Sequence, residues 1–294
     1  MSDDPGSYRG RFAPSPTGDL HLGSLVAAVA SFLEARKHGG AWLIRIDDID
    51  PQREVPGSAE SILRDLERLG LKSDEAILFQ STRTQTYRHV LEGLIASGDA
   101  YWCGCSRSDI PVSGVYPGTC REGLPAGRKP RSVRLNTDGV IALLEDRIQG
   151  RIEEALANTS GDFVIWRADG IPAYQLAVVV DDAYQRITEI VRGADLLDST
   201  LRQICLQQKL KLATPAYAHV PMVVDPSGDK LSKRRMADPV TSRNPAKALE
   251  VSLRLLGQQP PTGRSLPELW DWALANWAIE NVPRQRECEF KETT

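Results

Sequence analysis

The sequence lacks any long apolar segment. Its longest apolar runs, Leu25–Ala30 and Leu176–Val180, are far shorter than the roughly 20 residues that cross a bilayer. The first nine residues carry two aspartates and no apolar core, which argues against a secretory signal. We therefore expect a cytoplasmic protein that makes no contact with a membrane.

The sequence also has little excess of charge and few cysteines. Its 36 Lys and Arg against 39 Asp and Glu give a net charge of −3, which excludes a uniformly basic nucleic-acid coat but permits a local basic face. An odd number of cysteines, five among 294 residues, does not fit a disulfide framework. With 41% hydrophobic residues, the chain has the composition of one large α/β domain or two smaller ones.

Strand and helix patterns alternate at the start of the chain. A short apolar strand begins near Arg11, and apolar residues then recur at helical spacing over 20–37 until Gly39 and Gly40 stop the pattern. Residues 41–46 form the next apolar strand. A strand–helix–strand unit implies a parallel sheet whose ligand lies at the carboxyl ends of the strands. The predicted fold class is therefore α/β with a parallel, Rossmann-like sheet.

Further elements follow along the middle of the chain. Two helical patterns end at Gly70 and Gly98. Strands are expected at 163–166, 173–180, 187–191 and 220–224. A helix that reaches about Leu210 is expected after the third of these strands.

The apolar periodicity disappears between Cys103 and Leu135, where Gly, Pro and Ser become frequent. We interpret 103–160 as an insertion that divides the α/β domain into residues 1–102 and 161–240. Basic residues exceed acidic ones by four within 106–135. The basic residues are Arg107, Arg121, Arg128, Lys129, Arg131 and Arg134, and the acidic ones are Asp109 and Glu122.

The last part of the chain, 241–294, is expected to be a short helical tail. Asn244 as cap and Pro245 in the first turn predict the start of one helix, and the capping box of Ser265 and Glu268 predicts the start of a second. Basic and acidic residues balance in this tail. Such a balance is poorly suited to binding nucleic-acid phosphates.

Two segments have the chemistry of a nucleotide site. His21 opens the first helix, whose N-terminus favours phosphate, and Gly18 and Gly23 allow a base or phosphate to approach the backbone. Lys230 and Lys233 lie three residues apart on a loop and can close on a polyphosphate, where transition-state charge grows. Taken singly, a capping histidine and a solvated basic loop explain the same residues. The combination of the two segments is far more specific.

In combination these segments resemble the HIGH and KMSKS signatures of the class I aminoacyl-tRNA synthetases. They stand here as His21-Leu-Gly-Ser24 and Lys230-Leu-Ser-Lys-Arg234. Other segments are similar to the glutamyl branch of that family: Arg11-Phe-Ala-Pro-Ser-Pro-Thr-Gly18, Arg45-Ile-Asp-Asp-Ile-Asp50 and Val191-Arg-Gly-Ala-Asp195. The resemblance covers roughly residues 9–256. It implies a Rossmann-like class I synthetase catalytic domain.

The short tail departs from the glutamyl-tRNA synthetases, which continue into helical domains that read the anticodon. A short form with this layout resembles the glutamyl-Q tRNA(Asp) synthetases. That family activates L-glutamate with ATP and attaches it to the queuosine base in the anticodon of tRNA(Asp). The resemblance thus implies ATP, glutamate and queuosine-bearing tRNA(Asp) as partners. We expect a monomer, and the basic excess of the insertion predicts that an RNA stem docks there.

The resemblance also implies roles for individual residues. Glutamate would be bound by Arg11, Ser15, Tyr174 and Arg192, and its ammonium by Asp47, where the family usually has Glu. The alternative for Asp47 is that it caps its loop together with Asp48 and Asp50. ATP with Mg²⁺ would be held by Gly18, His21, Gly23 and Lys233. His21 and Lys233 would be the catalytic residues that stabilise the transition state, with Lys230 in support.

Three cysteines lie close together in the insertion. Cys103, Cys105 and Cys120 fall within 18 residues of an irregular segment, which suits a structural Zn²⁺. Three free buried thiols are the alternative. The resemblance adds Tyr116 as a fourth ligand, since the family motif includes a tyrosine. Cys205 and Cys288 lie far away in sequence and are not expected to bind the metal.

Three other functions remain possible from the sequence. The first is a truncated glutamyl-tRNA synthetase that charges the 3′ end of tRNA. The second is a non-catalytic paralogue that only binds tRNA, against which the intact His21, Lys230 and Lys233 argue. The third is a related nucleotidyltransferase with a different acceptor, which the glutamate-facing arginines make less attractive.

Overall fold

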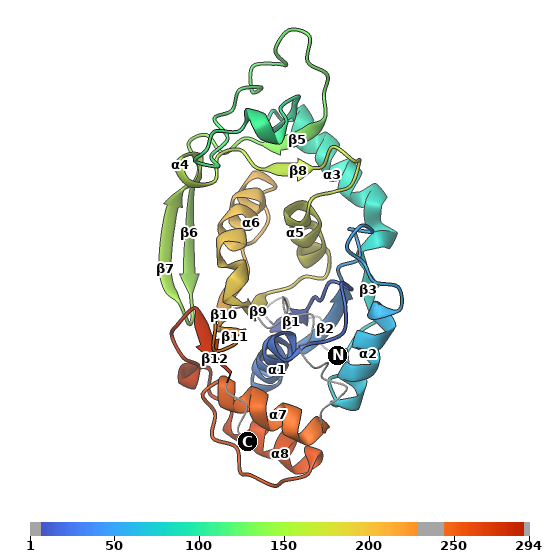
Figure 1. The fold of residues 1–294 in the computed structure, drawn as a ribbon, viewed down its shortest axis with the longest axis vertical. Helices are drawn as coiled ribbons and strands as arrows, with labels where there is room; N and C mark the ends of the chain where they lie inside the picture. The colour runs from blue at the N-terminus through green and yellow to red at the C-terminus, as the bar shows by residue number, and fades with distance from the viewer. Residues whose placement is uncertain (1–6, 229–243, 291–294) are drawn as a thin grey trace.

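The chain begins with the predicted strand–helix–strand unit. In the computed structural model, which describes residues 7–228 and 244–290, β1 (Arg9–Phe12), α1 (Leu22–Lys37) and β2 (Ala41–Ile46) follow in order (Figure 1). β1 pairs with β2 in parallel, and β2 pairs in parallel with the short β3 (Leu78–Phe79). This confirms the predicted parallel sheet at the start of the chain. α1 is buried over most of its surface because it is apolar on nearly every side.

A second sheet has the order β7-β6-β10-β9. Its members are β6 (Ile141–Asp146), β7 (Gly150–Ala155), β9 (Glu189–Gly193) and β10 (Ala216–Val220). β10 runs parallel to both β6 and β9, so the carboxyl ends of these three strands lie at one edge. The Thr188 N–H donates to the Arg9 carbonyl over 3.0 Å, which places the start of β9 beside the start of β1. The two sheets therefore adjoin through β1 and β9.

An antiparallel sheet forms where the predicted insertion joins the residues before and after it. β4 (Ala100–Cys103), β5 (Ser132–Leu135) and β8 (Val164–Trp166) form it in that order. The long segment between β4 and β5 forms the tip at the top of Figure 1. It holds one short 3₁₀ turn, Arg107–Asp109. The irregularity expected from the sequence is thus confined to this connection.

Helices cover the sheets and carry some of the site residues. They are α2 (Ser58–Arg68), α3 (Thr84–Ala96), α4 (Leu156–Thr159), α5 (Tyr174–Tyr184) and α6 (Leu197–Lys209). Further 3₁₀ turns lie at Gln80–Arg83, Ala194–Leu196 and Ile279–Asn281. The strand predicted at 173–180 is wrong, because these residues form most of α5. A short apolar run fits a buried helix as well as a buried strand, and here the helix continues to Tyr184.

The tail packs against the first helix rather than forming a separate body. α7 (Pro245–Leu255) and α8 (Leu266–Asn276) lie against α1 at the bottom of Figure 1. The predicted caps are confirmed: Asn244 accepts from the Ala246 N–H, and Ser265 and Glu268 form a capping box. β11 (Met222–Val224) pairs in parallel with β12 (Glu287–Glu289). The single strand predicted at 220–224 is therefore divided between β10 and β11.

Two apolar cores support this arrangement. One lies around α1, α7 and α8 and includes Leu25, Trp42 and Leu253. The other lies between α3, α5, α6 and the second sheet. Within the part of the chain that the structure describes, no helix has both the length and the apolar character to span a membrane.

Candidate active site and cysteine cluster

A small cavity lies where the loops after β1 and β2 meet the start of α5. Its volume is about 60 Å³. Three of the residues predicted to bind the substrate glutamate line it, namely Ser15, Asp47 and Tyr174. Asp50 and Arg167 also line it and form an ion pair of 3.0 Å. The cavity therefore presents carboxylate, hydroxyl and guanidinium groups within the space of a small polar ligand.

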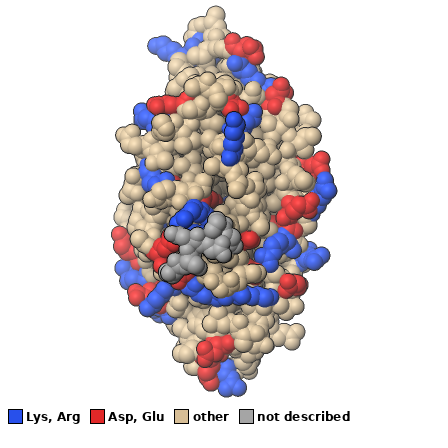
Figure 2. Space-filling model, turned by 180° about the vertical axis from the view of Figure 1, so that it is seen from behind, with Lys and Arg blue, Asp and Glu red and all other residues tan. Residues whose placement is uncertain are grey.

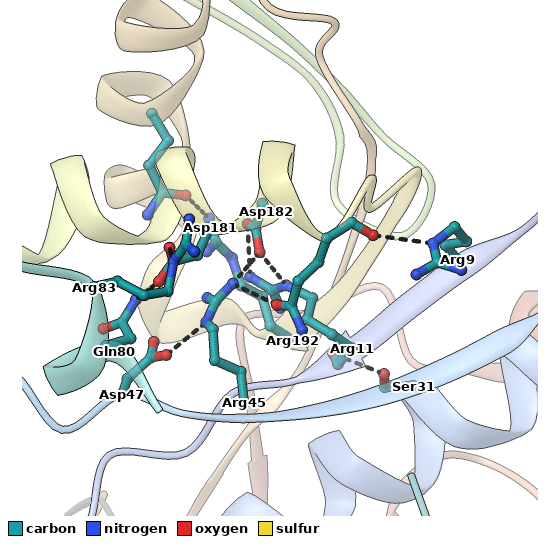
Figure 3. Close-up of polar contacts among 12 residues, drawn as sticks. Arg9, Arg11, Ser31, Arg45, Asp47, Gln80, Arg83, Asp181, Asp182 and Arg192 are labelled. Carbon is teal, nitrogen blue, oxygen red and sulfur yellow. Dashed lines mark hydrogen bonds and ion pairs between the residues drawn. The ribbon is translucent and has the colours of Figure 1, made fainter. Parts of the chain in front are cut away.

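Joined to Asp47 of the cavity through Arg45, two arginines share one buried carboxylate (Figure 3). Asp182 on α5 accepts from Arg11 Nε and Nη2 at 3.0 and 3.2 Å, and from Arg45 Nη1 at 2.6 Å. Arg45 Nε donates to Asp47 Oδ1 at 2.7 Å. All four side chains are almost completely buried. Asp47 is thus oriented by Arg45, and within the described residues its carboxylate makes no hydrogen bond with its own loop apart from that contact.

Burial and charge move the two carboxyl groups in opposite directions. Burial raises the pKa of Asp47 to about 6, because Arg45 compensates only part of the lost hydration. Burial also acts on Asp182, but the Arg11 and Arg45 guanidinium groups outweigh it and hold the pKa of Asp182 at about 2. Asp182 is therefore a fixed negative charge, whereas Asp47 titrates close to neutral pH.

The preceding residue of α5 anchors a second set of contacts. Asp181 accepts from Arg83 Nε at 2.6 Å, from Gln80 Nε2 at 2.9 Å and from the Tyr87 hydroxyl at 2.5 Å. These partners fix α5 against the segment that precedes α3 (Figure 3). Neither aspartate is among the site residues predicted from the sequence. The only available signal was that two adjacent carboxylates directly follow an apolar run.

Arg192, near the carboxyl end of β9, is bound along one edge only. Its Nη2 donates to Thr200 Oγ1 and Gln203 Oε1, both at 2.7 Å, and its Nε donates to His219 Nε2 at 3.2 Å. Its Nη1 is buried and has no hydrogen-bond partner within the described residues. The charge of Arg192 also acts on the phenol of Tyr174, which lines the cavity. A buried guanidinium N–H without a partner is a binding group for an anion.

His21 caps the first helix. Its Nδ1 accepts from the Ser24 N–H at 3.2 Å, and Ser24 Oγ lies 3.0 Å from its Nε2. A Cβ on Gly23 would lie 3.3 Å from His21 Nδ1, so glycine leaves room for the ring. Gly18 has a φ of +147°, which favours glycine for conformational reasons. Lys230 and Lys233, the other half of the predicted nucleotide site, lie outside the described residues.

The three cysteines of the insertion converge. The Sγ atoms of Cys103, Cys105 and Cys120 all lie within 4.8 Å of one another, and all three residues are buried. Cys105 and Cys120 Sγ are 3.7 Å apart, and the Tyr116 hydroxyl lies 3.3 Å from Cys103 Sγ and 3.4 Å from Cys105 Sγ. Tetrahedral zinc with Zn–S bonds of about 2.3 Å separates two sulfurs by about 3.8 Å. These residues therefore fit a metal ion.

Arg134 completes the surroundings of the cluster. Its Nε donates to Cys103 Sγ at 3.3 Å, and its guanidinium carbon lies 3.9 Å from the centre of the Tyr116 ring. Burial opposes ionisation of Cys103, but hydrogen bonds with Tyr116, the Cys105 N–H and Arg134 outweigh it and lower the pKa of the thiol. Burial raises the pKa of the Cys105 thiol. The arrangement already stabilises one thiolate.

The basic excess of the insertion is smaller at the surface than the sequence count indicates. Arg134 is buried at the cluster, Arg121 pairs with Asp162 at 2.7 Å, and Arg128 pairs with Asp109 at 2.7 Å. The exposed basic residues that remain are Arg107, Lys129 and Arg131. The count of charged residues within 106–135 overestimates the exposed positive charge, because it treats every charge as free. Half of the basic residues have partners in the fold.

The fold and the site define a class. The chain matches the family described as tRNA synthetases class I (E and Q), catalytic domain, over residues 7–111 and 120–265. Among solved structures, a glutamate tRNA ligase from Elizabethkingia meningosepticum in complex with its amino acid aligns with a TM-score of 0.81 and 27% identity. The alignment covers 97% of this chain and 67% of that one. This is therefore a class I synthetase catalytic fold, as the sequence predicts.

Curated relatives narrow the class. The glutamyl-Q tRNA(Asp) synthetase of Aromatoleum aromaticum is 52% identical over an alignment that covers 98% of this chain and 95% of the relative. The enzyme of that name from Chromobacterium violaceum is 51% identical over 94% of this chain and 95% of its own length. The one from Pseudomonas aeruginosa is 50% identical over 95% and 96%. The chain belongs to the glutamyl-Q tRNA(Asp) synthetase family, and these relatives do not favour the alternative functions.

Proposed function

We propose that this protein activates L-glutamate with ATP and transfers it to queuosine in the anticodon of tRNA(Asp). The observation that carries the activation step is that Asp47 and Tyr174 line one cavity, while the charge of Arg192 acts on Tyr174 and its buried Nη1 has no hydrogen-bond partner within the described residues. An amino acid with two carboxylates and an ammonium needs such groups of opposite charge. The acceptor follows from the relatives of the same length, which are named glutamyl-Q tRNA(Asp) synthetases.

The proposed roles in the amino-acid site follow from charge. Asp47 pairs with the substrate ammonium, and Arg192 offers Nη1 to a substrate carboxylate. Ser15 and Tyr174 line the cavity and orient the substrate. Arg11 acts on the same space through its charge while Asp182 holds it in place.

The proposed reaction is attack of the glutamate α-carboxylate on the α-phosphorus of ATP. Glutamyl-adenylate forms, and the bond to the β-phosphate breaks as pyrophosphate leaves. Positioning and electrostatics carry such a step without a protein nucleophile. His21 at the start of α1, with Gly18 and Gly23 beside it, would hold phosphate, and Lys233 with Lys230 in support would stabilise the growing charge. Mg²⁺ that accompanies the nucleotide would offset phosphate charge.

The proposed roles of the other parts concern structure and RNA. Cys103, Cys105, Tyr116 and Cys120 would hold one structural Zn²⁺, which would stabilise the insertion. The exposed Arg107, Lys129 and Arg131 would contact the RNA stem. The protein would act as a cytoplasmic monomer, with residues 1–102 and 161–240 forming the catalytic domain, 103–160 the zinc-binding and RNA-contacting insertion, and 241–294 the tail.

The proposed activation is tested by exchange of labelled pyrophosphate into ATP, with glutamate as substrate and total tRNA present. Glutamate-dependent exchange is expected, and Lys233→Ala should lower kcat by about 100-fold with little change in the KM for glutamate. Normal kcat in that variant would assign the lysine to a solvated loop. An absence of exchange in the unaltered protein would favour the non-catalytic alternative.

The acceptor is tested by mapping the label after transfer. Labelled glutamate is expected in the anticodon fragment after nuclease digestion, and only with tRNA that contains queuosine. Label on the 3′-terminal adenosine of an unmodified transcript would overturn the proposed acceptor and restore the truncated-synthetase alternative.

A further inference from the structure

Three neighbouring strands of the second sheet place three polar side chains in a row. Asp146 ends β6, His219 lies near the end of β10, and Arg192 lies near the end of β9. The parallel register pairs His219 directly with Arg192, so the two side chains share one face of the sheet. All three residues are buried. The row therefore leads from the edge of the β6–β7 hairpin to the guanidinium proposed to bind glutamate.

The hydrogen bonds of the row assign one tautomer to His219. Asp146 Oδ2 lies 2.6 Å from His219 Nδ1, and Asp146 Oδ1 accepts from the N–H groups of Ile148 and Gln149 at 2.9 and 2.7 Å. A carboxylate only accepts, so Nδ1 carries the proton and Nε2 keeps its lone pair. That lone pair faces Arg192 Nε at 3.2 Å and the Thr200 hydroxyl at 2.9 Å, and the hydroxyl can donate instead to the Leu196 carbonyl at 3.1 Å. Burial also lowers the pKa of His219, which favours the neutral ring that this contact requires.

The remaining contacts of Arg192 leave one nitrogen for a ligand. Thr200 Oγ1 and Gln203 Oε1 accept from Nη2, and the Tyr217 ring, stacked on His219, lies 5.5 Å from the guanidinium carbon. With Nε and Nη2 bound, the planar group cannot rotate without breaking several hydrogen bonds. Nη1 is held in one direction as a consequence.

We propose that Asp146 and His219 are positioning residues for the amino-acid substrate, because they hold Arg192 with its Nη1 directed at a glutamate carboxylate. The inference rests on the proposed function, in which Arg192 binds that carboxylate. Asp146 fixes the histidine tautomer, the histidine accepts from Arg192 Nε, and Arg192 meets the substrate. Neither Asp146 nor His219 touches the reacting atoms.

The test compares substitutions of His219 by steady-state exchange kinetics with total tRNA present. His219→Leu removes the acceptor, and His219→Gln places a carbonyl oxygen near the position of Nε2. We expect the KM for glutamate to rise about tenfold or more in His219→Leu, the scale of one hydrogen bond to a charged group. The KM for ATP should change less than about twofold, and His219→Gln should recover most of the affinity for glutamate.

Two further variants separate positioning from general stability. Tyr217 lies on the same strand as His219, and Tyr217→Phe removes only its hydroxyl, which accepts from Gln207 Nε2 at 2.9 Å. This variant should leave both KM values unchanged. Asp146→Asn keeps the shape of the side chain but removes its charge, and should raise the KM for glutamate several-fold, less than His219→Leu. If His219→Leu fails to fold, the comparison of Asp146→Asn, His219→Gln and Tyr217→Phe gives the answer.

The outcomes are distinct. A selective rise in the KM for glutamate, reversed by glutamine at position 219, supports the positioning role. Unchanged KM values, or equal rises for glutamate and ATP, would overturn it while the proposed function stands. If the unaltered protein shows no glutamate-dependent exchange, the proposed function itself fails and the positioning role falls with it.

Discussion

At the scale of the residue, burial decides what a charged side chain does. Asp47 and Asp182 both contact Arg45, yet only Asp182 also has a second guanidinium, from Arg11. The carboxylate with two partners is held ionised, and the carboxylate with one partner keeps a pKa of about 6. A bound substrate ammonium would supply the second positive charge that Asp47 lacks.

This difference predicts a pH dependence of glutamate binding. Since the pKa of Asp47 is raised to about 6, its carboxyl group becomes neutral as the pH falls through that value and loses its attraction for an ammonium. The KM for glutamate should therefore rise between about pH 7 and 5. The same shift makes the native protein bind the proton more tightly, so this group stabilises the fold less as the pH rises through about 4 to 6.

The control for this prediction is Asp47→Asn. This variant should show a raised KM for glutamate that no longer depends on pH over the same range. An acid limb of equal size in the variant would assign the titration to another group.

We predict that substitution of Asp182 lowers the stability of the fold strongly. Asp182→Asn leaves two buried guanidinium groups with less neutralising charge, so the free energy of unfolding should fall by about 3 kcal/mol or more. Because the pKa of Asp182 is lowered to about 2, the stability it contributes is fully present above the pKa of the unfolded chain and is lost as the pH falls from there through about 2. Urea unfolding measures this change.

The matched substitution Asp169→Asn removes the exposed partner of Arg167 and should alter the free energy of unfolding little. Equal effects of the two substitutions would show that burial is not what makes Asp182 important.

At the scale of the element, the sequence predicts what depends on local patterns. The strand–helix–strand unit and the caps of α7 and α8 follow from apolar spacing and capping residues, and the structure confirms them. The nature of α5 does not follow, because its run of alanine and valine suits either a buried strand or a buried helix. The β6–β7 hairpin was not predicted, since Ile141 and Leu143 expose apolar side chains and obscure the alternation.

In the site too, local sequence patterns predict some features, whereas others depend on how distant segments pack. Cys103, Cys105 and Cys120 are close in sequence, so their convergence could be predicted. The partnership of Arg11 with Asp182 joins residues 171 positions apart, and it depends on how α5 docks against β1. The links from Arg192 to Thr200, Gln203 and His219 depend likewise on packing between β9, β10 and α6. No local pattern carries such information.

We predict that the stability of the protein depends on a metal ion bound by the cysteine cluster of the insertion. Purified protein should contain one Zn²⁺ per chain, and Cys105→Ser should lose it because the cluster then offers one thiolate fewer. We expect the melting temperature to fall by about 5 °C or more, which for a chain of this length corresponds to a destabilisation of about 3 kcal/mol. Metal analysis and thermal unfolding measure the two effects.

Cys205→Ser serves as the matched control, since Cys205 is buried in α6 away from the cluster. It should retain the zinc. Freshly purified protein without zinc would leave the free-thiol interpretation standing. Activation of glutamate should suffer less than stability or transfer to tRNA, since none of the four predicted ligands lines the cavity.

At the scale of the whole molecule, charge is distributed rather than concentrated. The net charge is −3, and Figure 2 shows basic and acidic side chains interspersed over one face. The tail is balanced and packs on α1, so it offers no broad basic surface of its own. RNA binding by such a molecule must depend on a few exposed cations.

The cations that we propose to contact RNA are Arg107, Lys129 and Arg131, which are exposed in the segment between β4 and β5. Replacing all three with Gln should weaken tRNA binding, and the slope of log K against log salt should fall by about one for each RNA phosphate that is no longer neutralised. Titration of tRNA(Asp) at several salt concentrations measures both quantities. Glutamate-dependent pyrophosphate exchange should remain within about twofold, because none of the three residues lines the cavity.

The matched control removes three exposed cations elsewhere, namely Lys37, Arg64 and Lys72, near α1 and α2. It changes the net charge by the same amount, so a general electrostatic effect would weaken tRNA binding equally in both triple variants. A reduced slope only in the first variant would assign the RNA stem to the insertion. An equal reduction in both would contradict RNA binding by the insertion. The long β4–β5 connection would then serve only to support the cysteine cluster.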